Sequence, residues 1–236
     1  MKGFGDLYKS ENKRNKKSKL SREKIINQAI HFHFQGNIQK AIENYEYCIK
    51  KGFNDPGVFS NYGAILQSLG KLENAEKSFR KAIELNPNFA EAHSNLGNIL
   101  MDLGEDKKAE LSYRKAIELR PDYADAYSNL GNVLKNSGRL QEAELNVRKA
   151  IELNPDFPNA HYNLGNILTA LGKLQDAESH TRKAIELNPD FVDAHINLRN
   201  ILVHLAKFKE AKICLEKIMC MRPWSILGSY GFNYEI

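Results

Sequence analysis

The sequence predicts an all-α protein built as a stack of repeated helix pairs, and three observations lead to this fold class. A unit of 34 residues recurs along most of the 236-residue chain, and a fixed period of this size is typical of a stacked repeat array. Within the unit, apolar residues recur at intervals of three and four, which is the helical period. Glycine and proline recur where each helix is expected to end.

The repeated unit is clearest in residues 90–123, which read AEAHSNLGNILMDLGEDKKAELSYRKAIELRPDY. Steps of 34 residues from this unit divide residues 22–225 into six units without a gap. The middle four units agree closely, whereas the first and last are degenerate, as expected of units that face something other than another repeat. The six units are 22–55, 56–89, 90–123, 124–157, 158–191 and 192–225.

Each unit is expected to fold as a helix, a turn and a second helix. In the unit at residue 90, we expect the first helix over 91–103 and the second over 106–119. Gly104 should end the first helix, because glycine tolerates the left-handed conformation beyond a helix end, and Pro121 should end the second. Gly97 lies in mid-helix, where glycine costs roughly 1 kcal/mol relative to alanine. Its recurrence predicts a close approach between helices, with Ala109 opposite.

The recurring N-L-G-N…G…A-E…A-I-E-L-N-P pattern resembles the tetratricopeptide repeat (TPR) and covers residues 22–225. The resemblance implies a right-handed superhelix (α-solenoid) of antiparallel helix pairs. The first helices would line its concave face and the second helices its convex face. It also implies the usual role of the family, which is to bind a peptide or a partner protein in the concave groove.

Asparagines recur at two positions of the first helix, three residues apart and therefore on one helical face. An amide offers donors and an acceptor, so a row of amides can bond a peptide backbone at regular intervals. The arrangement is similar to the asparagine ladder in the repeats of eukaryotic O-linked N-acetylglucosamine transferase. In the alternative, one line bonds the neighbouring helix instead of a ligand. The candidate groove residues are Asn61, Asn95, Asn129, Asn163 and Asn197 in the first line, and Asn98, Asn132, Asn166 and Asn200 in the second.

The positions beside these asparagines become more apolar towards the C-terminal half of the array. They lack the lysine and arginine groups with which chaperone-binding members of the family hold a C-terminal carboxylate. We therefore do not expect chaperone tails as ligands. The residues before the first line are Ser60, Ser94, Ser128, Tyr162 and Ile196; farther along the helix come Gln67, Met101, Lys135, Thr169 and Val203.

The sequence shows no phosphate-binding loop, nucleophile motif or metal motif. We therefore expect no enzymatic activity, no catalytic residues, no cofactor and no metal. His93, His161 and His195 occupy the unit position of Phe59 and Tyr127, which favours packed aromatics over ligands. The three cysteines have no disulfide or metal spacing, which favours a reducing compartment, and we expect the cytoplasm. No apolar run approaches the roughly 18 residues of a membrane span, so no membrane partner is expected.

The net charge of +5 is concentrated near the N-terminus, in a basic leader over residues 1–21. The segment Lys9–Lys19 has almost no apolar content and is expected to be disordered. It could contact nucleic acid or an anionic surface weakly, or act only as a solubilising leader. We favour the leader, because no aromatic residue or structured basic face accompanies the run. Nucleic acid is therefore not expected as the partner.

The last unit departs from the pattern, since Arg199 and Ala206 replace glycines of the other units. The tail over residues 226–236 is aromatic and contains glycine, so we expect it not to be helical. Three alternatives would cover the last unit: the tail itself, a partner (including end-to-end self-association of the uncapped repeat), or the continuation of a longer protein.

Two functions follow from the resemblance. The first is a protein–protein interaction scaffold that binds an extended peptide or partner protein. The alternative is a substrate-recruiting arm of a glycosyl- or sulfotransferase-type enzyme whose catalytic domain is missing or separate.

Overall fold

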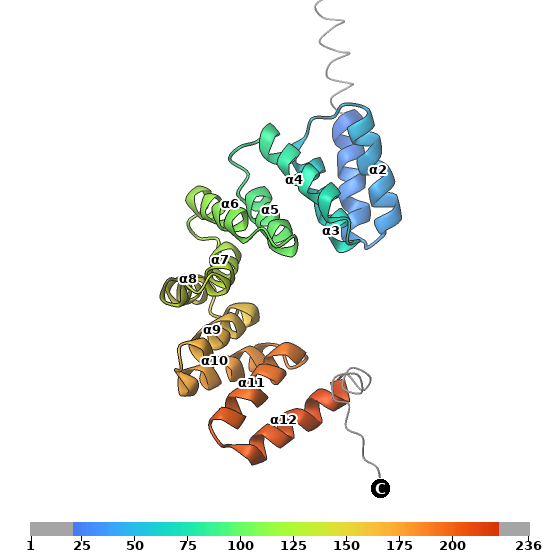
Figure 1. Ribbon diagram of the computed structural model, residues 1–236. Coiled ribbons are helices and arrows are strands. Elements are labelled where there is room, and N and C mark those ends of the chain that lie inside the picture. Colours follow the sequence, from blue (N-terminus) through green and yellow to red (C-terminus); the bar gives the residue numbers. More distant parts are fainter. Residues whose placement is uncertain (1–20, 222–236) are drawn as a thin grey trace, which may run out of the picture. The chain divides into compact units, whose positions relative to one another are not determined.

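The computed structural model describes residues 21–221 of the chain, and every regular element in this range is a helix (Figure 1). The chain divides into two compact units: unit 1 spans Met1–Glu105 and unit 2 spans Asp106–Ile236. The expectations for residues 1–20 of the leader and for the tail over 226–236 lie outside the described residues.

The described part of unit 1 starts with a helix over residues 21–34. Its further helices are α2 (Ile38–Lys50), α3 (Pro56–Ser68), α4 (Leu72–Leu85) and α5 (Ala90–Asp102). Each helix from α2 to α5 packs against the next, and α3 also contacts α5. The largest buried side chains of the unit include Tyr45 and Phe79, both with no exposed surface. Asp55 begins α3 by accepting hydrogen bonds from the amides of Gly57 and Val58, which satisfies donors that a helix start leaves open.

Unit 2 contains seven helices within the described residues: α6 (Asp106–Leu119), α7 (Ala124–Asn136), α8 (Leu140–Leu153), α9 (Pro158–Ala170), α10 (Leu174–Leu187), α11 (Val192–His204) and α12 (Phe208–Met221). Consecutive helices pack from α6 to α12, and α9 also contacts both α7 and α11. The first helices of successive repeats therefore lie side by side. The predicted fold class, all-α with stacked helix pairs, is confirmed.

The helix ends follow the recurring glycine and proline positions closely. In the repeat over residues 90–123, the first helix was expected over 91–103 and is Ala90–Asp102. The second helix is Asp106–Leu119, as expected. Gly104 has a φ of +74°, in the left-handed region that favours glycine. In the last repeat Ala206 takes this place with a φ of +57°, as the one described non-glycine residue with a positive φ.

The mid-helix glycines mark close helix approaches, as the sequence predicts. A Cβ atom on Gly131 would lie 2.2 Å from Cγ2 of Val147 and 3.2 Å from the carbonyl oxygen of Ala143. A Cβ on Gly165 would lie 2.3 Å from Oγ1 of Thr181. A side chain therefore fits at neither position unless its neighbours move.

Within residues 21–221, no helix combines the length and the apolar character needed to cross a membrane.

Candidate functional site

The two asparagine lines lie on the first helices of the repeats. In unit 2 each of the helices α7, α9 and α11 carries one pair, and because α9 contacts the other two, the lines run from helix to helix. In unit 1, α3 carries Asn61 and α5 carries Asn95 and Asn98. All of these side chains are half-buried except Asn200, which is exposed. The predicted site residues of each unit thus lie on first helices that contact one another.

First-line asparagines make contacts inside the stack. Nδ2 of Asn163 on α9 donates a hydrogen bond of 3.0 Å to Oγ of Ser128 on α7, and Ser128 is fully buried. Nδ2 of Asn197 lies 3.5 Å from Oγ1 of the buried Thr181 on α10. At Asn163 the amide therefore bonds the neighbouring first helix, which is the alternative that the sequence left open.

The first line meets a different environment in unit 1. Burial raises the pKa of the Tyr45 hydroxyl to about 12, against the opposing effect of the nearby Asn61 amide. Tyr45 has no exposed surface. Asn61 therefore lies against the core of the first repeats.

Two second-line asparagines of unit 2 differ from Asn163, because their side chains have no partner among the described residues of the stack. Within the described part of the chain, the side chains of Asn132 on α7 and Asn166 on α9 make no hydrogen bond to another residue. Both side chains are half-buried. Their amide atoms are not among the fully buried polar atoms that lack a hydrogen-bond partner, so these atoms are accessible to solvent. Their amides therefore reach the solvent-accessible surface of the first helices.

The positions that flank the asparagines on α9 and α11 include apolar side chains. The rings of Tyr162 and Phe191 lie 4.9 Å apart between centroids. On α11, Ile196 is 36% exposed and Val203 is 42% exposed. Helix α9 has no charged residue.

Of the three histidines expected to be packed aromatics, His161 and His195 are buried and His93 is half-buried. All three also make a hydrogen bond that was not predicted from the sequence. Nε2 lies 2.9–3.0 Å from the carbonyl oxygen of the proline six residues earlier. A carbonyl can only accept, so Nε2 carries the proton. The sequence does contain a signal for this bond, because each of these histidines follows a repeated proline by six residues. The three pairs are His93 with Pro87, His161 with Pro155, and His195 with Pro189.

One of these histidines faces a second imidazole. Nδ1 of His161 lies 3.1 Å from Nδ1 of His180 on α10, and the rings are stacked. Because Nε2 of His161 is the donor to Pro155, a neutral His161 accepts at Nδ1 and His180 donates. Burial lowers the pKa of His180, and the nearby His161 lowers it further. Among the described residues no three His, Cys, Asp or Glu side chains are grouped to hold a metal ion.

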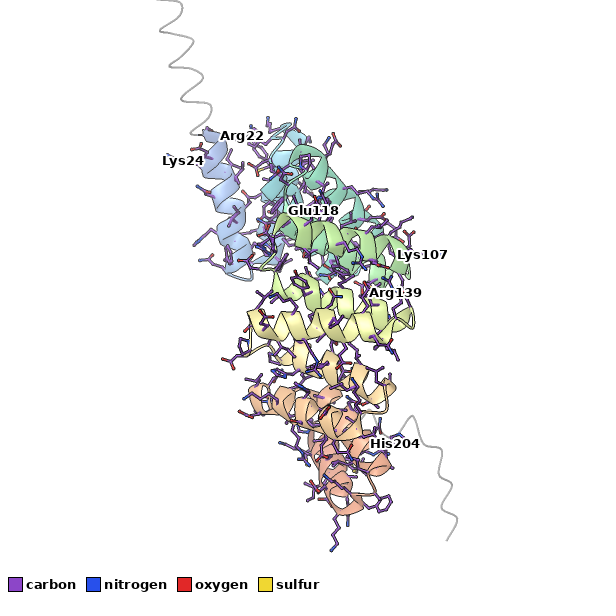
Figure 2. All side chains as sticks on the ribbon, turned by 90° about the vertical axis from the view of Figure 1, so that its left-hand side faces the viewer. Arg22, Lys24, Lys107, Glu118, Arg139 and His204 are labelled. Carbon is purple, nitrogen blue, oxygen red and sulfur yellow. The ribbon has the colours of Figure 1, made fainter. Side chains whose placement is uncertain are left out.

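Ion pairs join successive second helices of unit 2. Glu110 on α6 bonds Arg114 in its own helix and Arg139 at the start of α8, each at 2.8 Å; Figure 2 labels Arg139. Glu142 contacts the same two arginines. The pattern recurs with Glu144 and Lys173, and with Glu178 and Lys207. These groups lie on the second helices, away from the asparagine lines, and we assign them to the stack.

The pKa values of these acids follow from their cation partners. Burial alone would raise the pKa of Glu110 and of Glu178, but hydrogen bonds from arginine and lysine outweigh it and lower the value. In Glu144 the bond from Lys173 is the largest cause of the lowered pKa. Further ion pairs lie near the C-terminal ends of two second helices, as Lys115–Glu118 and Lys149–Glu152.

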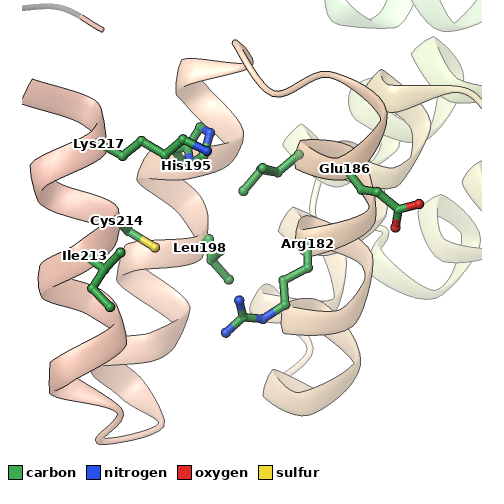
Figure 3. Close-up of a pocket in the computed structure, with 8 residues that line it drawn as sticks. Arg182, Glu186, His195, Leu198, Ile213, Cys214 and Lys217 are labelled. Carbon is green, nitrogen blue, oxygen red and sulfur yellow. The ribbon is translucent and has the colours of Figure 1, made fainter. Parts of the chain in front are cut away.

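Two hollows occupy the same repeat position in the second and last repeats. One, of ≈ 390 Å³, is lined by Phe59 and Ser78 among others. The other, of ≈ 320 Å³, is lined by His195 and Cys214 in the same places (Figure 3). In the repeat between residues 158 and 191, His180 stands where Ser78 and Cys214 stand and stacks on His161.

Comparison with known proteins supports the repeat assignment. A family profile described as "TPR repeat" matches residues 63–104 and 97–138. A second, described as "Tetratricopeptide repeat", matches residues 124–157 and 158–191. No curated protein matches the chain.

Among solved structures, the chain is similar to YrrB, described as a TPR protein with an unusual peptide-binding site. The identity is 26%, the match covers 79% of this chain and 96% of YrrB, and the TM-score is 0.59. It is also similar in fold to PilW, a type IV pilus biogenesis factor (21% identity, 87% and 96% coverage, TM-score 0.78). A third similar fold is that of PilF from Pseudomonas aeruginosa (15%, 88% and 94%, 0.75).

The two profiles together match residues 63–191, which is more than half of the chain, and the helix pairs of both units agree with them. The chain therefore belongs to the tetratricopeptide repeat family.

Proposed function

We propose that this TPR interaction scaffold binds an extended segment of a partner protein across α7 and α9, with the amides of Asn132 and Asn166 bonding the backbone of that segment. The observation that carries the proposal is that these two amides lie on adjacent first helices, reach the solvent-accessible surface and have no partner among the described residues. Amides without a packing role are suited to a ligand.

The spacing of the helices fits an extended backbone. Packed helices lie about 8–10 Å apart. A segment in the polyproline II conformation presents the same face every three residues, or about 9 Å, and leaves its backbone groups free to bond. One asparagine on each helix would then meet equivalent backbone groups three residues apart.

First-line asparagines play a supporting part in this proposal. Asn163 donates one of its two amide N–H groups to Ser128, so fewer of its hydrogen-bonding groups are left for a ligand. The likeness to the peptide-binding YrrB supports a peptide as the ligand class. A recruiting arm of a transferase-type enzyme would use the same groove, so the experiment below bears on that alternative too.

Selection of random peptides displayed on phage against the whole chain tests the proposal. We expect wild type to enrich a set of peptides, and Asn132→Ala/Asn166→Ala to lose at least tenfold of their binding. The matched control is Asn74→Ala/Asn146→Ala, which removes two amides from second helices and should keep the binding. Equal recovery of the same peptides by the groove variant would contradict the proposal.

Helix α12 offers a second candidate surface for a partner, because it exposes apolar side chains. Leu215 is 36% exposed although the equivalent Phe79 and Val147 have no exposed surface, and Met219 is 51% exposed. End-to-end self-association would cover this face. Sedimentation velocity of Leu215→Lys/Met219→Lys should then show less oligomer than wild type, and a monomeric wild type would exclude it.

A further inference from the structure

The repeat position three residues beyond the second asparagine line has different partners in the two units. In unit 1 it is Gln67 on α3, whose Nε2 donates a hydrogen bond of 3.3 Å to Oδ2 of Asp102 on α5. This bond connects a residue of one first helix to a residue 35 positions later on the next. Side chains at this position can therefore reach across to the following repeat.

In unit 2 the same two positions hold Lys135 on α7 and Ala170 on α9. Lys135 is half-buried, and burial lowers the pKa of its ammonium group. The place of the accepting carboxylate is taken by a methyl group. Within the described residues Lys135 makes no ion pair or hydrogen bond through its side chain.

A cation that is partly removed from water without a compensating anion is costly, so this position favours an incoming negative charge. Within the described residues of unit 2, no acid forms an ion pair with Lys135. Glu144 and Glu178 are bonded to cations on the second helices, and α9 contributes no charged side chain. Asp125 lies in the first turn of α7, and Lys135 in the last.

We propose that Lys135 binds a carboxylate side chain of the partner segment, so that the groove of unit 2 selects extended peptides with an aspartate or glutamate at one fixed position. The inference rests on the proposed function, since the same segment would be held by Asn132 and Asn166. Lys135 follows Asn132 by three residues on one face of α7, so the carboxylate would lie beside the segment's bonded backbone. The bond would be charge-assisted and hence among the stronger ones available.

Three variants of the whole chain test the assignment in the same phage-display selection. Peptides selected by wild type should be enriched in aspartate or glutamate at one position, and Lys135→Met should remove that preference. Ala170→Asp keeps the lysine but supplies the carboxylate that Asp102 provides in unit 1, so it too should remove the preference. Ala170→Asn is the neutral control of similar size and should retain it.

Direct binding of one selected acidic peptide and its amide counterpart (Asp→Asn or Glu→Gln) gives the magnitude. One charge-assisted bond corresponds to roughly tenfold in affinity, so wild type should prefer the acid about tenfold and Ala170→Asp should bind the two alike.

The two proposals fail differently. Selected peptides that need Asn132 and Asn166 but show no acidic preference would overturn the role of Lys135 and leave the groove proposal standing. An acidic preference that survives in Ala170→Asp would also overturn it. The peptide carboxylate would then be bound by a group other than Lys135, whose ammonium group the new aspartate should occupy. Failure of wild type to enrich any peptide would overturn both.

Discussion

Units 1 and 2 are built from the same repeat but join successive repeats by different side chains. In unit 2 an acid of one second helix meets a base at the start of the next, as in Glu144–Lys173 and Glu178–Lys207. The corresponding positions in unit 1 hold two acids, Glu76 and Glu105, and Glu76 bonds Arg80 in its own helix at 2.6 Å. The fold of the repeat thus tolerates either a basic or an acidic side chain at the start of the second helix, where unit 2 has an ion pair between repeats.

The cores differ in a related way. In unit 1 the mid-helix Gly63 faces the ring of Phe79, and a Cβ there would lie 3.0 Å from Cε1. In unit 2 the residues facing the glycines are the smaller Val147 and Thr181, and the approach is closer. Smaller partners allow the helices to come nearer, so unit 2 depends more on glycine.

The largest expected effect is therefore the loss of a unit 2 glycine. Gly131→Ala should lower the free energy of unfolding by about 1–3 kcal/mol through overpacking, even after the gain of roughly 1 kcal/mol in helix propensity. Gly63→Ala should cost less, because its neighbour is the edge of a ring at 3.0 Å. Urea unfolding followed by circular dichroism measures both; equal losses would refute the contrast between the cores.

The ion pairs come next. Glu178→Gln should lower the free energy of unfolding by about 1 kcal/mol, since its carboxylate meets both Arg182 and Lys207 and its side chain is only 11% exposed. Glu76→Gln removes a pair within one helix, worth about 0.3–0.5 kcal/mol. A larger loss for Glu76→Gln in the same urea titration would show that the linking pairs contribute little.

The turn of the last repeat offers a stabilising change. Ala206 has a φ of +57°, a conformation that costs an L-residue roughly 1–2 kcal/mol. Glycine avoids this strain, but its greater loss of conformational entropy on folding costs about 0.5–1 kcal/mol relative to alanine. Ala206→Gly should thus raise the free energy of unfolding by about 0.5–1 kcal/mol. The reverse change, Gly172→Ala in the preceding repeat, should lower it. A drop in melting temperature for Ala206→Gly would contradict this account.

The smallest effect concerns pH and is confined to unit 2. The folded-state pKa of His180 is lowered, so its stabilising contribution is present above the unfolded value of about 6.5 and is lost as the pH falls below it. His180→Asn, which copies Asn146 of the preceding repeat, should reduce the loss of stability between pH 7.5 and pH 5. An unchanged pH dependence of the free energy of unfolding would exclude this role.

The repeat made the fold predictable, and its departures made the site harder to predict. Helix ends followed from Gly104 and Pro121, because their backbone preferences act locally. The Asn163–Ser128 bond depends on how two helices face each other, which the spacing of asparagines alone does not determine. The linking pairs of unit 2 were missed, although an acid with a base 29 residues later recurs in three repeats.

Whether the second asparagine line serves binding rather than packing is tested most directly by measuring peptide affinity and unfolding free energy on the same variants. For Asn132→Ala/Asn166→Ala we predict at least a tenfold loss of affinity for a selected peptide, with the free energy of unfolding within about 0.5 kcal/mol of wild type. Asn163→Ala should instead lose about 1–3 kcal/mol of stability, because buried Ser128 loses its partner. Unchanged affinity in the double variant, or a stability loss like that of Asn163→Ala, would contradict the account.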